Sequence, residues 1–132
     1  SSDVCSSDLL TAAKTPSDIV KREFDPDYTR ETVTLAAGPA LVAGAVLGRD
    51  ATTGTYAPSP ATGSGGVEVA CAVLLTDAAA SANARTALAL VRGPAIVADA
   101  ALTFDASVDD DAKRAIKRAQ LAAHGIVAQF AI

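Results

Sequence analysis

Short hydrophobic runs separated by glycine dominate the chain from about residue 33 onward. The first four runs and the glycines among them are 33–35, 41–42, 46–47, 55–56, Gly38, Gly44, Gly48 and Gly54. Runs this short, rich in β-branched residues and bounded by Gly, Pro and Asp, are typical of strands joined by tight turns. The last two runs flank GRDATTG, which predicts a hairpin with Gly54 at positive φ.

Further strands are predicted in the second half of the chain. Residues 67–75 place their odd-numbered apolar positions on one face, while Ala72 and Leu74 predict that the far end is covered on both faces. Residues 86–92 and 95–97 predict two strands broken at Gly93 and Pro94, and residues 126–130 predict a last one.

One helix is predicted over residues 107–125. Ser107 or Asp109 would be its N-cap, acids fill its first turn, and Gly125 stands where a helix-ending glycine is expected. One small-residue face consists of Ala112, Ala115, Ile116, Ala119, Ala122 and Ala123, and the side chains predicted to face water are Lys113, Arg114, Lys117 and Arg118. The fold class is therefore mainly β, with one α-helix in the C-terminal half and α+β character.

Three segments are distinguished along the chain. Residues 1–9 are interpreted as non-native, because the run from Asp3 to Leu9 matches what one reading frame of a common sequencing adapter encodes. Residues 10–32 are polar and without a sustained period, which predicts an extended N-terminal arm ordered on contact with a partner. Residues 33–132 are predicted to form a single domain.

Composition and charge exclude several classes of function. Most hydrophobic residues are Ala and Val, with no Trp or Met, so a core of small side chains favours stabilisation by association. The formal charge of −4 argues against nucleic-acid binding. No apolar run reaches the roughly 18 residues of a membrane span, and the first 20 residues do not resemble a signal peptide.

Candidate reactive groups are few. The two cysteines, Cys5 and Cys71, predict neither a disulfide framework nor a metal site, and Cys71 is interpreted as a small buried residue. His124 is interpreted as a cation at the helix end or a plain surface residue, and residues 109–111 as acids that complement the helix dipole. GSGG at residues 63–66 is predicted to be a loop and DPDY at 25–28 a proline-set turn. We therefore predict no enzyme activity, no cofactor and no small-molecule substrate.

Several motifs in order resemble the head decoration proteins of tailed phages, the lambda protein D family. The segment from Tyr28 to Pro58 resembles the opening of that family, with TRETVTL, a glycine, LVAGAVLG and TGTY in sequence. Later segments AVLL, VRGPAIV, ALTF and AAHGIVAQ resemble the family in the same order. Phe104 stands where the family often has Trp.

The resemblance implies a β-clip-like decoration protein on the outer surface of the virion, made in the cytoplasm of the bacterial host. Such proteins bind as homotrimers at threefold and quasi-threefold sites of the expanded head and clamp the major capsid protein against the pressure of packaged DNA. The arm would add a strand to the capsid protein. The residues expected to make this contact are Tyr28, Thr29, Arg30, Glu31, Thr32, Val33 and Thr34.

Two alternatives stay open at this point. Another virion-surface module, such as a fibre or receptor-binding accessory, would share the strands but needs a ligand pocket, which few aromatic residues could line. A small enzyme with Cys71 as nucleophile would need a group that stabilises the thiolate.

Overall fold

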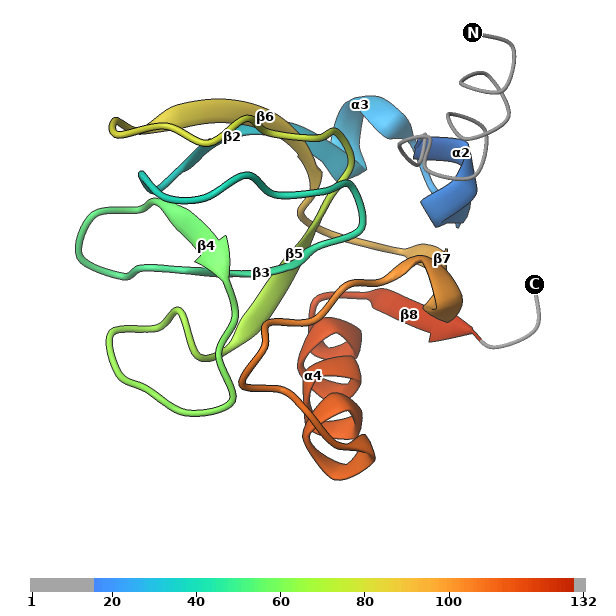
Figure 1. Ribbon diagram of the computed structural model, residues 1–132. Coiled ribbons are helices and arrows are strands. Elements are labelled where there is room, and N and C mark those ends of the chain that lie inside the picture. The colour runs from blue at the N-terminus through green and yellow to red at the C-terminus, as the bar shows by residue number, and fades with distance from the viewer. Residues whose placement is uncertain (1–15, 130–132) are drawn as a thin grey trace, which may run out of the picture.

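The computed structural model describes residues 16–129 (Figure 1). Its elements in chain order are α2 Pro16–Ile19, β1 Val20–Glu23, α3 Pro26–Thr29, β2 Arg30–Leu35, β3 Val46–Arg49, β4 Tyr56–Pro58, β5 Ala70–Leu74, β6 Arg85–Leu90, β7 Ala95–Ala98, a 3-10 turn Asp99–Ala101, α4 Asp111–Ala123 and β8 Ile126–Gln129. The mainly β fold with one long helix near the C-terminus confirms the predicted fold class. Among these residues, none of the helices has the length and apolar character that crossing a membrane requires.

The strands form two sheets that lie side by side in Figure 1. Strands β2, β4, β3, β5 and β6 close a barrel, and β1, β7 and β8 form a three-stranded sheet with β7 in the middle. The barrel closes weakly between β2 and β4, where the register is the single parallel pair Leu35 and Tyr56. By contrast, β2 pairs with β6 along its whole length.

The predicted hairpin is confirmed as β3 and β4, which pair antiparallel. Gly54 in its turn has φ +76°, which an L side chain rarely adopts. Gly48, however, lies inside β3 rather than in a turn. A Cβ atom there would stand 1.9 Å from the carbonyl oxygen of Val67, so this glycine is required by close packing of two backbones.

Two apolar clusters form the core. The first fills the barrel and includes Val33, Leu35, Leu47 and Leu74, all buried. The second joins the barrel to the three-stranded sheet and to α4, and its larger members are Ile19, Val46, Val73, Leu75, Leu90, Val97, Leu121 and Ile126. Because Val73 and Leu75 enter the second cluster while Leu74 enters the first, the far end of β5 is covered on both faces, as predicted.

Helix α4 begins and ends close to the predicted positions. Asp110 is the N-cap, rather than Ser107 or Asp109, and its carboxylate accepts a hydrogen bond from the Lys113 amide at 2.8 Å. His124 is the C-cap, and Gly125 follows with φ +82°, as the sequence predicts for a helix-ending glycine.

The orientation of α4 is the reverse of the prediction. Lys117, predicted to face water, is 1% exposed, while Ile116 of the small-residue face is 56% exposed. The alanines of that face are also exposed: Ala112, Ala115, Ala119, Ala122 and Ala123.

Polar contacts hold the inward face of α4. The Lys117 ammonium donates to Ser59 Oγ at 2.9 Å and to the Glu68 carbonyl oxygen at 2.5 Å. Gln120 Oε1 accepts from the Ala70 amide at 2.8 Å, and Arg118 Nε lies 2.6 Å from Asp99 Oδ1. The polar side chains therefore bond β5, the loop before it and the 3-10 turn.

The segment before residue 33 has more structure than an extended arm. Strand β1 pairs antiparallel with β7, and the side chains of Ile19 and Val20 enter the second core cluster. Thr29 is fully buried. These contacts, spread over a polar segment, fix residues 16–32 to the body of the protein. Residues 1–15, which include the run interpreted as non-native, lie outside the described residues.

Candidate functional site

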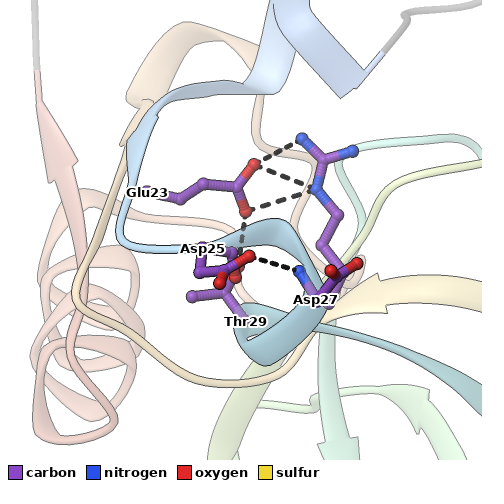
Figure 2. A network of polar contacts seen from close by, with 5 residues as sticks. Glu23, Asp25, Asp27 and Thr29 are labelled. Carbon is purple, nitrogen blue, oxygen red and sulfur yellow. Dashed lines mark hydrogen bonds and ion pairs between the residues drawn. The ribbon is translucent and has the colours of Figure 1, made fainter.

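A polar network holds the connection between β1 and β2 in place (Figure 2). The Glu23 carboxylate at the end of β1 accepts from the Thr29 hydroxyl at 2.5 Å and from Arg30 Nε at 3.0 Å. Asp25, which lies between Glu23 and Thr29 in the sequence, is the N-cap of the short helix α3. The Oδ1 atom of Asp25 accepts a hydrogen bond from the Asp27 amide at 3.0 Å. The network fixes the direction in which α3 presents its exposed side chains.

The protonation of Glu23 follows from these contacts. Burial acts to raise the pKa of the Glu23 carboxyl, but the hydrogen bonds from Arg30 and Thr29 and the charge of Arg30 outweigh it. The net effect lowers the pKa below its ordinary value of 4.5. Glu23 is therefore an ionised carboxylate at neutral pH, and its charge is matched by that of Arg30.

An aromatic and charged surface lies directly beside this network. The rings of Phe24 and Tyr28 meet edge to face, with centroids 6.2 Å apart, and both side chains are more than half exposed. The Arg92 guanidinium carbon lies 5.2 Å from the centroid of the Tyr28 ring, and Nη2 donates to Glu31 Oε2 at 2.8 Å. Arg92 also bonds the Tyr28 carbonyl oxygen.

Strand β2 continues this surface with an edge that is open around Thr32, because the Arg30 amide at its start bonds the Pro26 carbonyl oxygen. Thr32 stands opposite Leu88 of β6. The Leu88 carbonyl oxygen points away from β2, because it accepts a hydrogen bond from the amide of Leu75, the residue after β5, at 2.9 Å. Because the backbone groups of a strand alternate between its two edges, Thr32 directs its N–H and C=O away from β6. Within the described residues, that edge of β2 is paired only at Leu35, with Tyr56 of β4.

The seven residues expected to contact a partner therefore separate into two groups. Thr29 and Val33 are buried and serve the fold, and Arg30 is half-buried in the Glu23 network. The exposed members are Tyr28, Glu31, Thr32 and Thr34. Sequence reasoning missed Phe24 and Arg92, which complete the surface. Arg92 lies far from Tyr28 in sequence and reaches it only because β6 pairs with β2.

The remaining candidate residues show no arrangement for chemistry within the described part of the chain. Cys71 is half-buried, and burial raises the pKa of its thiol, although contacts with Arg49 oppose the shift. A raised pKa disfavours the thiolate that a nucleophile needs.

The other candidates have structural roles. Asp109 bonds the ammonium of Lys113 at 2.8 Å, and residues 63–66 lie in a loop, as predicted. Residues 16–129 contain no group of three or more His, Cys, Asp or Glu side chains arranged to hold a metal ion.

Comparison with known proteins agrees with the motifs. A comparison with individual curated proteins found no significant match. The family profile described as bacteriophage lambda head decoration protein D matches residues 9–126, which is most of the 132-residue chain. The match spans every strand of the barrel and extends to the first residue of β8. The chain therefore belongs to the family of bacteriophage lambda head decoration protein D.

Proposed function

We propose that the protein binds as a homotrimer to the outer surface of the expanded phage head. There it clamps neighbouring major capsid subunits, at threefold and quasi-threefold sites, against the pressure of packaged DNA. The open edge of β2 is the observation that carries the proposal. Membership of a head decoration family supports the location on the virion, and the part played by the protein is structural rather than enzymatic.

The contact with the capsid protein is a strand added beside β2. Thr32 offers an amide and a carbonyl to such a strand, while Thr34 and Glu31 contribute exposed side chains. Main-chain bonds of this kind provide affinity, and the alternating side chains provide specificity. The strand is held by β6 before the partner arrives, so little backbone entropy is lost on binding.

The oligomeric part of the proposal is supported by α4. Its outward face carries Ile116 and five alanines, while the charges of Arg118 and Arg114 are matched within the chain by Asp99 and Asp111. Copies of the chain that meet across this face would bury apolar area. The two arginines would keep their partners, because Asp99 and Asp111 belong to the same chain. Three copies on one site would then add their weak capsid contacts through avidity.

The experiment uses the open amide of Thr32. Thr32→Pro removes this N–H but no hydrogen bond to β6, and proline is tolerated at an unpaired strand edge. Thr32→Ala is the matched control because it shortens the same side chain and keeps the amide. We expect Thr32→Pro to fold and to lose cosedimentation with expanded heads stripped of their decoration protein, while Thr32→Ala cosediments like the wild type.

Two results would contradict the proposal. The first is a wild-type protein that stays monomeric at high concentration and does not attach to mature heads. The second is normal attachment of the Thr32→Pro variant. Deletion of everything before residue 34 is a poorer test, because it also removes Ile19, Val20 and Val33 from the core.

A further inference from the structure

A small apolar pocket lies between the segment that follows β2 and the segment that precedes α4. It has a volume of about 260 Å³, and it is lined by residues 39–42, Ala45, Pro58 and residues 103–106. Val42 in the lining is 50% exposed. The pocket is smaller than the roughly 300–1,000 Å³ of small-molecule sites, so it fits a single side chain of a partner better than a free ligand.

Backbone hydrogen bonds hold both walls of the pocket. In the wall formed by residues 39–42, the Leu41 amide donates to the Ala78 carbonyl at 2.9 Å, and the Ala78 amide donates back at 2.8 Å. In the wall formed by residues 103–106, the Thr103 amide donates to the Gly44 carbonyl at 2.9 Å. A pocket whose walls are fixed in advance loses little backbone entropy when a partner binds.

Asp105 is the one charged residue in the lining. Its Oδ2 accepts hydrogen bonds from the Ser107 amide at 3.1 Å and from the Ser107 hydroxyl at 2.5 Å. A carboxylate has about four acceptor positions, so these two bonds leave room for a further donor. Among residues 16–129, no cation forms an ion pair with Asp105.

The cations next to the pocket are bonded elsewhere. The guanidinium carbon of Arg118 lies 5.8 Å from the centroid of the Phe104 ring, but Arg118 pairs with Asp99 at 2.6 Å. The Lys117 ammonium is buried among its own hydrogen-bond partners. Burial lowers the pKa of Lys117, and the charge of Asp105 is one of those that oppose the shift. A cation that enters the pocket therefore meets an acidic wall and no unpaired positive charge.

An apolar lining with one carboxylate matches the side chain of lysine or arginine. Such a side chain buries its aliphatic stem along apolar surface and directs its charged end to a polar partner. Here the stem would lie against Val42 and Phe104, and the charged end would reach Asp105. A basic partner is also complementary to the whole chain, whose formal charge is −4, whereas a second copy carries charge of the same sign.

The pocket lies within reach of the partner proposed for β2. Leu35 ends β2, and Pro39 of the pocket stands four positions further along the chain, a span of at most about 14 Å. On the other side, Pro58 ends β4, the strand that pairs with Leu35 through Tyr56. A partner that is bound at the open edge of β2 can therefore place a side chain in the pocket.

We propose that this pocket receives a lysine or arginine side chain of the major capsid protein. The stem of that side chain fills the space between residues 39–42 and residues 103–106, and its charged end bonds the Asp105 carboxylate. The inference rests on the proposed function, since it assigns a second contact of the same complex. This contact is made by one side chain and needs no strand pairing.

Removal of the charge of Asp105 tests the electrostatic part with the full chain. Asp105→Asn keeps the size of the side chain and an oxygen that can accept from Ser107. The matched control is Asp50→Asn, because Asp50 Oδ1 also accepts from amides two and three positions later and lies outside the pocket. We expect Asp105→Asn to bind stripped heads about threefold or more weakly at low salt, with the loss shrinking as salt is raised.

The control should bind like the wild type. Wild-type binding by Asp105→Asn would overturn the inference, and so would an equal loss in both variants, because the loss would then not depend on the pocket.

A second variant adds a charge without touching the bonds of Asp105. Val42→Lys places a cation in the lining, where it competes with the incoming side chain and repels it. We expect weaker binding to stripped heads and an unchanged mass in sedimentation equilibrium. Val42→Thr is the matched control, since it keeps the shape of the side chain and adds no charge. Normal attachment of Val42→Lys would contradict the inference.

Photo-crosslinking identifies the occupant. Benzoylphenylalanine is placed at position 40 in one variant and at position 106 in another, because both residues are exposed and they belong to the two different walls. Decorated heads are irradiated, and the crosslinked peptides are sequenced. A peptide of the major capsid protein that contains lysine or arginine supports the inference. A peptide from a second copy of this chain, or a capsid peptide without a basic residue, overturns it.

The two proposals can fail separately. Wild-type protein that does not bind heads contradicts the proposed function itself. Binding that is lost with Thr32→Pro but unchanged with Asp105→Asn and Val42→Lys leaves the β2 contact in place and removes only the pocket.

Discussion

Arg30 and Glu23 join the start of β2 to the end of β1: Arg30 Nη2 lies 2.5 Å from Glu23 Oε1, and the Glu23 side chain is 9% exposed. Glu23→Gln keeps the size of the side chain but removes its charge. We expect the variant to lose about 1–2 kcal/mol of unfolding free energy, because hydrogen bonds to a charged group are the stronger ones. Urea denaturation at pH 7 measures the loss, and unchanged stability would show that the network contributes nothing.

The same carboxylate predicts a pH dependence. Its pKa in the folded protein lies below 4.5, so the folded state binds this proton less readily than the unfolded chain. The stability from Glu23 is therefore fully present above about pH 4.5 and is lost as the pH falls through the lower folded pKa. Denaturation curves at decreasing pH should show the difference between wild type and Glu23→Gln shrinking in the acid range. A constant difference would contradict the assigned protonation.

Most of the strand pattern of the barrel could be predicted from the sequence because it depends on local signals. The predicted run at residues 41–42 is the exception, since it forms no strand and Leu41 makes only an isolated bridge with Ala78. The hairpin of β3 and β4 follows from short apolar runs around a glycine turn, and the end of α4 follows from the helix-ending glycine, Gly125. The surface that we propose for capsid binding could be predicted only in part. Its position near Tyr28 follows from family motifs, whereas Arg92 reaches Tyr28 through the pairing of β6 with β2.

Helix α4 shows why amphipathic patterning failed. The rule assumes that charged side chains prefer water and that apolar ones are buried. Lys117 has partners that are distant in sequence, Ser59 and the carbonyl of Glu68, and no local pattern reveals them. Its burial turns Ile116 outward. An interface between copies of the chain requires an outward apolar face. The prediction of helix orientation therefore failed at the helix face that we assign to contacts between copies.

Lys117 itself provides a stability prediction. Burial lowers the pKa of its ammonium group, although the charges of Glu68 and Asp105 oppose the shift. Lys117→Met keeps the apolar stem but leaves Ser59 Oγ and the Glu68 carbonyl without this donor. We expect a loss of about 1–3 kcal/mol in the free energy of unfolding, the cost of unsatisfied buried groups. Urea denaturation of the variant and the wild type measures this loss.

The matched control for this variant lies one turn earlier on α4. Lys113 is 41% exposed and its ammonium pairs with acids at the start of its own helix, Asp109 and Asp110. Lys113→Met should therefore change stability little, since exposed pairs contribute little. If Lys117→Met is as stable as the wild type, the buried hydrogen bonds do not hold α4 in its orientation.

Ile116 tests the assignment of the outward face of α4 to contacts between copies. Ile116→Glu places a charge on a side chain that is 56% exposed, so the fold of the single chain should be preserved. Glutamate is also a good helix former, which keeps the change local. In the proposed trimer the carboxylate would be desolvated without a partner, and we expect the trimer to dissociate at concentrations where the wild type is assembled.

The control for Ile116→Glu changes an apolar residue away from the helix. Val42 is 50% exposed, so Val42→Glu adds the same charge to a side chain of similar exposure. Because Val42 lies outside the face assigned to contacts between copies, this variant should remain trimeric. Sedimentation equilibrium gives the masses of both variants. A trimeric Ile116→Glu variant would show that the copies meet elsewhere, since a buried carboxylate without a partner is too costly to leave an interface across α4 intact.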